Sequence, residues 1–209
     1  SQISGGASVG LVGVGGFVAV EDYGGSVSAS IGDNTQIDNV TDLTVSAALR
    51  SGDDIVIELP DDDNITVKAV NSTVIGASVG AVGIAASIAQ VNLAENATAT
   101  IGDNVTVTTN TDSGELSITA DRDVDAEVNV VSIAAGLAAA GVSYAGLTAT
   151  GDATVNVGDG TNIATNASRF GDSVIRARNT SSQKAKGVSA GLGYAGAVVG
   201  AVVNIDDTG

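Results

Sequence analysis

The residues of this chain best suited to bind a ligand are aspartates, and several of them stand in Gly-Asp units or in runs. Carboxylate oxygens are hard ligands of the kind that Ca²⁺ prefers in proteins. Some of these aspartates directly follow a glycine, and others form a continuous run of three. The candidate calcium ligands are Asp33, Asp61, Asp62, Asp63, Asp103 and Asp159.

A structural interpretation of the Gly-Asp units competes with calcium binding. Neither the aspartate spacing of an EF-hand loop nor the Gly-Gly-x-Gly-x-Asp nonapeptide is present in full. Aspartate and asparagine in a turn commonly hydrogen-bond to the neighbouring backbone. Both interpretations stay open, and calcium is the single cofactor that the sequence suggests.

The composition leaves little room for catalysis. The chain has no histidine and no cysteine, so zinc sites, disulfides and thiol chemistry are excluded. Its eight lysines and arginines are scattered along the sequence, whereas solenoid enzymes that cleave acidic polysaccharides need carboxylates clustered beside a basic residue. Because no nucleophile paired with a base can be named, we predict that the protein is not an enzyme and has no catalytic residues.

Two motifs recur at one common displacement, which indicates an internal repeat. The octapeptide GASVGLVG at 6–13 returns as GASVGAVG at 76–83. Ile-Gly-Asp-Asn at 31–34 returns at 101–104 with the same displacement, and Val-Gly-Asp-Gly follows at 157–160. The predicted repeats of this single repetitive segment are 3–71, 72–131, 132–188 and a truncated 189–209.

The residues around the Gly-Asp units predict strands joined by tight turns. Polar and apolar residues alternate over 26–31 and 104–108, which is the period of a half-buried strand. We expect the glycines of these units to supply a positive φ, and the neighbouring aspartates and asparagines to hold the turn by bonding to their own nearby backbone. The predicted turn residues are Gly32, Gly102, Gly158, Asn34 and Asn104.

Repeated strands and turns predict an all-β fold, a parallel β-helix (β-solenoid) built from repeats of about 55–70 residues. We expect each repeat to hold three or so coils of about 20 residues, a length typical of solenoids. The repeats differ in length after the Gly-Asp unit, where the run at 61–63 lies, so we expect surface loops there.

Three nearly uncharged blocks of Gly, Ala and Val need a separate explanation. They cover 74–93, 130–147 and 187–203, and alone they could form transmembrane helices that pack through small residues. They lack flanking basic clusters and aromatic anchors. We favour strands that are apolar on both faces, with a flat outer face suited to lateral packing.

Charge and residue size narrow the function further. The 209 residues carry a formal charge of −16, which repels nucleic acid and anionic membranes and keeps a long polymer soluble. There is no Met or Trp, and there are only two Phe, so we expect a thin core of stacked Val, Ile, Ala and Leu. A mean hydropathy of +0.30 with 44% apolar residues argues against disorder.

Asn-x-Ser/Thr sequons are frequent in this chain. They can be glycosylation sites on an exported surface, or they can arise automatically where turn asparagines precede Thr-rich strands. The sequence leaves both interpretations open. The sequon asparagines are Asn39, Asn64, Asn71, Asn96, Asn104, Asn166 and Asn179.

With these repeats, the chain resembles the repeat regions of giant bacterial filamentous adhesins, namely the haemagglutinin-like or two-partner-secretion exoproteins and the large leukotoxin-like surface proteins. The segments Ser26–Ala47 and Ala97–Ala120 carry the likeness. The resemblance implies a right-handed parallel β-helix that is exported to the cell surface as a stalk or adhesive fibre. The long small-residue blocks depart from the usual pattern.

We therefore predict a structural or adhesive segment of a long extracellular surface fibre. Its expected partners are neighbouring repeats of the same chain, laterally associated copies and a host or cell-surface glycan, with no nucleic acid and no membrane insertion. Ser1 is not a start methionine, so we expect a piece of a longer exported protein. The alternatives are a calcium- or carbohydrate-binding module and, third, a membrane-embedded repeat protein.

Overall fold

The structure is a computed structural model that describes residues 2–51, 55–58, 64–67, 70–110, 113–163 and 170–208. All regular elements in these ranges are strands, so the all-β prediction is confirmed. No helix that could cross a membrane occurs within them. The strands are β1 (Gln2–Val9), β2 (Val12–Ile31), β3 (Gln36–Val40), β4 (Leu43–Ser51), β5 (Ile55–Glu58), β6 (Asn64–Val67), β7 (Val70–Val79), β8 (Val82–Ile101), β9 (Thr106–Thr109), β10 (Glu115–Thr150), β11 (Ala153–Val157), β12 (Asn162–Ile163) and β13 (Asp172–Thr208).

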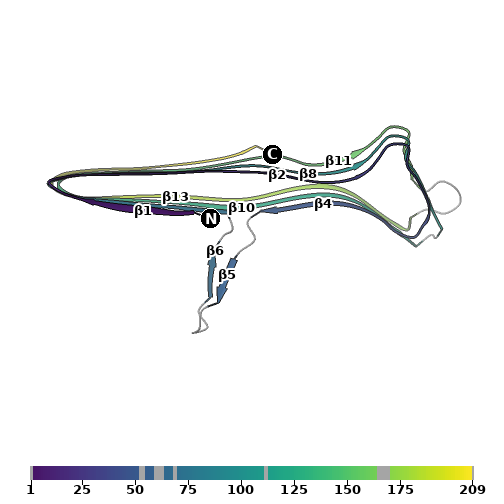
Figure 1. The fold of residues 1–209 in the computed structure, drawn as a ribbon, viewed down its shortest axis with the longest axis horizontal. Coiled ribbons are helices and arrows are strands. Elements are labelled where there is room, and N and C mark those ends of the chain that lie inside the picture. Colours follow the sequence, from purple (N-terminus) through teal and green to yellow (C-terminus); the bar gives the residue numbers. More distant parts are fainter. Residues whose placement is uncertain are drawn as a thin grey trace.

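The chain runs back and forth along one long axis (Figure 1). β1 runs out to one end of the molecule, here called the tip, and β2 returns from it. β7 and β8 repeat this path, whereas β10 and β13 each contain both an outgoing and a returning leg. The Gly-Asp turns lie at the opposite end, here called the corner end. One outgoing leg, its returning leg and the corner that follows are called a pass.

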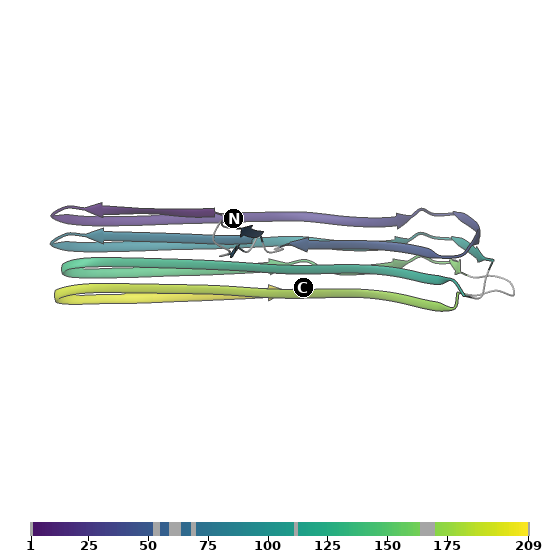
Figure 2. The ribbon, with the colours of Figure 1, turned by 90° about the horizontal axis from the view of Figure 1, so that it is seen from below.

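Successive passes pair in parallel and in register, as Figure 2 shows from below. Gly6 pairs with Gly76, so the displacement shared by the two sequence motifs is the register of the strands. The next passes continue the stack, with Ala77 paired to Ile133 and Ile133 paired to Ala190. Each pass is therefore built from one whole sequence repeat.

The expectation of about three coils in each repeat is wrong. β2 and β8 have 20 residues each, β10 has 36 and β13 has 37. Strands of this length use a full repeat for one journey out and back, which leaves no residues for further turns. The spacing of turn motifs gave the repeat length correctly but did not reveal how far each strand extends.

Outgoing legs form one layer and returning legs form the other, and β10 and β13 join the two layers at the tip. All strand pairings of the resulting eight-stranded sheet in the described residues are parallel. At the corner end β3, β9 and β12 form a separate three-stranded parallel sheet. The sheet is open at its edges, where β1 and β2 lie on one side and β13 lies on the other.

The core lies between the two layers and is built from alternate residues of each leg. In β8 the odd-numbered residues are buried and the even-numbered ones face outward. One core cluster includes Val91, Val128 and Leu147, and a second, nearer the corner end, includes Ile101 and Ile118. Rows of short aliphatic side chains therefore fill the interior, because parallel register brings equivalent residues together.

The three Gly/Ala/Val blocks are strands, so the transmembrane-helix alternative is wrong for them. They form parts of β7 and β8, of β10 and of β13. Their inner face is not wholly apolar, because Ser78, Ser87, Ser132 and Ser143 are buried there. The expectation of strands that are apolar on both faces therefore holds only for the outer side near the tip, before Gln90 and Asn92 of β8.

A hairpin projects from the second pass (Figure 1). Ser51 pairs with Val124 and Val70 pairs with Ala126, so residues 52–69 stand where β10 has only Asp125. β5 and β6 within this insertion pair antiparallel. The sequence predicted a variable surface segment here, and the described part of it is this hairpin. The aspartates at 61–63 lie outside the described residues.

Candidate functional site

The Gly-Asp units stack directly on one another at the corner end. The amide of Gly102 donates to the carbonyl of Ile31 at 2.9 Å, and that of Gly158 donates to Ile101 at 2.8 Å. In the reverse direction Asn34 donates its amide to the carbonyl of Asp103 at 2.8 Å. The three turns are thus joined by backbone bonds from one pass to the next.

The aspartate side chains add to these bonds between corners, and the whole set of bonds is here called the corner ladder. Asp33 Oδ1 accepts the amide N–H of Asp103 at 2.9 Å, and Asp103 Oδ1 accepts that of Asp159 at 2.8 Å. The sequence predicted that each aspartate would brace its own turn. The acceptor role is confirmed, but the donor is the amide of the equivalent aspartate in the next pass.

The predicted positive φ of the glycines is wrong. The left-handed residues of these turns are Asn34 (φ 54°), Asn104 (φ 53°) and Gly160 (φ 68°), each two positions after the glycine of the unit. Asparagine tolerates this region better than most residues. The left-handed residue of each turn is therefore the last residue of the four-residue unit. The presence of Gly32, Gly102 and Gly158 needs another explanation.

Steric contact between passes explains those glycines. A Cβ on Gly102 would lie 2.3 Å from Asp33 Oδ1, and a Cβ on Gly158 would lie 2.4 Å from Asp103 Oδ1. A Cβ on Gly32 would meet nothing within 4 Å. Glycine is thus required wherever another corner lies underneath, because the preceding carboxylate occupies the space of a side chain.

The corner ladder gives little support to the calcium interpretation. Asp33, Asp103 and Asp159 are exposed and stand in one row, as predicted from the repeat. No group of three or more acidic side chains that could hold a metal is found in the described ranges. Two of the three aspartates already use one oxygen on a backbone amide. Calcium binding by these residues stays an untested prediction.

Several sequon asparagines serve the same cross-pass bonding. Asn96 Oδ1 accepts the amide of Asp152 at 2.9 Å, and Asn104 Nδ2 lies 3.5 Å from Asn34 Oδ1. Asn179 donates to the carbonyl of Gly151 and also accepts from an arginine. The amide nitrogens that a glycan would need are therefore engaged at two of these sites.

Arg122 is a buried charge that the sequence did not predict. Its side chain is fully buried between Ala120 of one core cluster and Val124 of the other. It donates to the carbonyls of Glu95 (2.8 Å) and Thr150 (3.1 Å) and to Asn179 Oδ1 (2.7 Å). A buried guanidinium needs such acceptors, so Arg122 joins three passes at one point.

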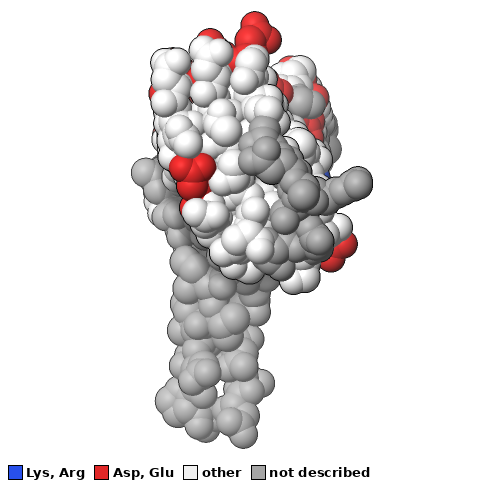
Figure 3. All heavy atoms as spheres, turned by 90° about the vertical axis from the view of Figure 1, so that its right-hand side faces the viewer, with Lys and Arg blue, Asp and Glu red and all other residues white. Residues whose placement is uncertain are grey.

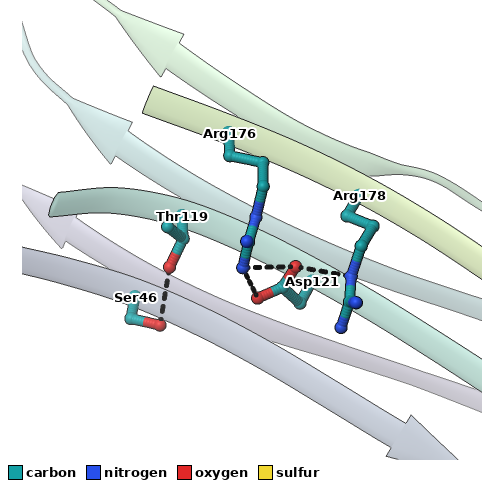
Figure 4. A network of polar contacts seen from close by, with 5 residues as sticks. All are labelled: Ser46, Thr119, Asp121, Arg176 and Arg178. Carbon is teal, nitrogen blue, oxygen red and sulfur yellow. Dashed lines mark hydrogen bonds and ion pairs between the residues drawn. The ribbon is translucent and has the colours of Figure 1, made fainter. Parts of the chain in front are cut away.

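Half of the basic residues lie close together on one strand. Arg176 and Arg178 of β13 both reach Asp121 of β10, with shortest separations of 3.0 and 3.2 Å (Figure 4). Thr119 donates to Ser46 at 3.0 Å beside them. Lys184 and Lys186 follow on the exposed side of β13, which places four of the eight basic residues there. The description of the basic residues as scattered along the sequence therefore applies only to the other four.

The first pass carries two aromatic side chains in its interior. Phe17 and Tyr23 pack against the core cluster, and the Tyr23 hydroxyl donates to Glu21 Oε2. Burial, together with this bond to a carboxylate and its charge, raises the pKa of Tyr23 to about 12. Glu21 and Tyr23 are two residues apart on β2, so both side chains lie on the same, inner face of the strand.

Acidic side chains lie around the rim of the corner end, with uncharged surface between them (Figure 3). No nucleophile and base are brought together by the contacts described above.

No family model, no curated protein and no solved structure matches the chain. We therefore infer the function from the geometry of the passes and their corners.

Proposed function

We propose that this chain is a parallel β-solenoid segment that serves as a rigid structural or adhesive part of a long extracellular surface fibre. The observation that supports it best is the corner ladder, in which a carboxylate of each corner accepts a backbone amide of the next. Such a ladder can be extended by one pass after another, because each corner presents the same groups to the next.

Parallel register accounts for the proposed rigidity. Strands β2 and β8 are paired along their whole length, and β10 and β13 pair along nearly all of theirs. The backbone hydrogen bonds of these pairings run along the stacking direction, and successive passes lie about 4.8 Å apart. Bending such a rod requires many backbone hydrogen bonds to be distorted together, so the fibre axis is the stacking direction.

Charge and chemistry are consistent with a scaffold on a cell surface. A net charge of −16 keeps neighbouring fibres soluble and repels anionic surfaces. The proposed partners are neighbouring repeats of the same chain, other copies that associate laterally and a surface glycan. The likeness of residues 26–47 and 97–120 to filamentous adhesins supports an exported, non-enzymatic role.

Electron microscopy of tandem fusions tests this proposal. Fusions of one, two, four and six copies of the chain are compared, and each copy of four passes is expected to add about 20 Å along the stacking direction. A fusion with serine substituted for the buried valines of β8 and β10, namely Val91, Val124, Val128 and Val130, serves as a control that cannot form the core. Compact particles whose longest dimension does not grow with copy number would contradict the fibre.

A further inference from the structure

The outer side of the returning legs carries an unpartnered apolar surface near the tip. This surface, here called the apolar tip face, consists of the outward-facing residues of 12–20, 82–88, 138–146 and 196–202. It contains no charged residue. Toward the corner end polar residues replace it, first Gln90 and Asn204 beside Gly146 and then, one row on, Asp22, Asn92 and Thr148 in register.

Exposure of this face is not a consequence of the open sheet edges. Ile84, Ile88 and Val142 lie in the two inner passes and have a paired strand on both sides, yet they are 41%, 38% and 49% exposed. On the opposite side of the same strands, Ser87 and Ser143 are fully buried. Bulky apolar side chains therefore point outward while small hydroxyls fill the interior, which marks an interaction surface.

A groove runs across the apolar tip face. Its volume is about 460 Å³, and it is lined by alanines and two glycines, among them Ala138, Ala140 and Gly196, between the taller Ile84 and Val198. Two rows toward the corner end, Tyr144 stands on the same strand as the alanines. Its ring lies over Gly146, where a Cβ would be 2.9 Å from the ring. The face thus offers both a hollow and a large side chain.

We propose that the apolar tip face binds the same face of a second copy, about a two-fold axis parallel to the stacking direction. This arrangement rests on the proposed fibre, because it gives the lateral association a defined surface. The axis passes through the row of Val142, so Tyr144 of each copy meets Ala140 of the other. A single face can then supply both the protrusion and the hollow, as a two-fold interface requires.

Electrostatic repulsion favours this arrangement over one in which the strands of the two copies run in the same direction. Each copy carries a charge of −16, and like charges at close range repel. Reversal of the strand direction overlaps only the uncharged tips and directs the two acidic corner ends away from each other. Because the axis is parallel to the stacking direction, each pass meets its own counterpart and two fibres can associate along their length.

The area and the open edges favour a second copy over a lipid bilayer. Four strands about 4.8 Å apart, two of them nine and two of them seven residues long, give about 510 Å² per copy, or about 1,000 Å² in total. That total reaches the roughly 1,000 Å² expected of a specific interface. In lipid, by contrast, the unpaired backbone groups along β2 and β13 would each cost several kcal/mol.

Cysteine cross-linking tests the arrangement cleanly because the chain has no cysteine. Val142→Cys lies on the proposed axis and is expected to give a disulfide-linked dimer under mild oxidation. Ile133→Cys, 42% exposed on the outer side of the outgoing layer, is the matched control and is expected to stay monomeric. Absence of the dimer at position 142, or equal cross-linking at both positions, would overturn the proposal.

Sedimentation velocity provides the second measurement. Tyr144→Ala is expected to weaken dimerisation at least tenfold, because a central aromatic residue dominates many interfaces. Added NaCl is expected to strengthen dimerisation, since salt screens the repulsion between the acidic bodies. An interface that weakens with salt would be ionic and would contradict the apolar tip face.

Vesicle flotation separates the competing occupant. Uncharged phosphatidylcholine vesicles are mixed with the chain and with Ile84→Glu, and Ala94→Glu on the same outward side of β8 is the control. Flotation of the chain that only Ile84→Glu abolishes would assign the face to lipid and overturn the dimer. Loss of the dimer while tandem fusions still form rods would refute this interface and leave the proposed fibre standing.

Discussion

Gly32 and Gly102 hold the same position in equivalent turns, but only Gly102 has a neighbour in the space that a side chain would fill. Gly102→Ala is expected to lower the free energy of unfolding by about 1–3 kcal/mol, because Cβ would overlap Asp33. Gly32→Ala is the control and should be nearly neutral. Thermal unfolding followed by circular dichroism measures both, and equal losses would show that the glycines serve the turn and not the stacking.

Arg122 and Arg178 provide a matched comparison of a buried and an exposed guanidinium. Arg122→Leu leaves its three acceptors unpaired, among them the buried carbonyl of Glu95, and we expect a loss of about 1–3 kcal/mol in the free energy of unfolding. Arg178 is 53% exposed beside Asp121, so Arg178→Leu should cost less than about 1 kcal/mol. Denaturant titration measures the difference, and a stable Arg122→Leu variant would refute the bonding role of Arg122.

Tyr23 makes stability depend on pH in the alkaline range. Its pKa rises from the ordinary value of 10.0 to about 12 on folding, so between these values the unfolded chain has lost a proton that the folded chain keeps. Its stabilising contribution is present below pH 10 and is lost as pH rises toward 12. Tyr23→Phe should remove both this alkaline loss and a tyrosinate absorbance change with a midpoint near pH 12.

The turns could be located from the sequence, but the role of each turn residue could not. Glycine and asparagine both tolerate positive φ, so composition alone did not show that Asn34 and Asn104 adopt it. The need for Gly102 comes from the carboxylate of Asp33 in the preceding pass, which no local pattern contains. Arg122 was missed for the same reason, because two of its acceptors, Glu95 and Asn179, come from neighbouring passes.

Among the elements, the projecting hairpin is separable from the sheet. Residues 52–69 occupy the place of Asp125 alone in the next pass, so we expect a variant in which one aspartate replaces 52–69 to keep β4 and β7 in line. Its unfolding midpoint should stay within a few degrees of the original. Circular dichroism and thermal unfolding measure this, and loss of the β spectrum would show that the insertion is needed for folding.

Strand character could be predicted where polar and apolar residues alternate, as in 26–31. In the Gly/Ala/Val blocks the same alternation is inverted, with serine inside and isoleucine outside, so it indicated neither the inward face nor the strand length. The register that brings Arg176 beside Asp121 is likewise a property of the stack. It follows from the pairing of β10 with β13, which weak sequence similarity between these strands did not define.

For the whole molecule, salt and calcium distinguish a braced acidic scaffold from a calcium-loaded one. We expect NaCl to raise the unfolding midpoint of the chain, because screening reduces repulsion among a net 16 negative charges. CaCl₂ at matched ionic strength should give the same increase, since Asp33 and Asp103 each already accept a backbone amide. Differential scanning calorimetry measures both series.

A calcium-specific increase would contradict this expectation, and two variants would then locate the ion. If Asp103→Asn abolishes the increase, the corner ladder binds calcium, and its carboxylates both brace the backbone and coordinate the metal. If replacement of 52–69 abolishes it instead, the ligands lie in the insertion that holds the run at 61–63. Because the ladder needs its acceptor oxygens and asparagine keeps one, stacking should survive in Asp103→Asn, which separates metal binding from rigidity.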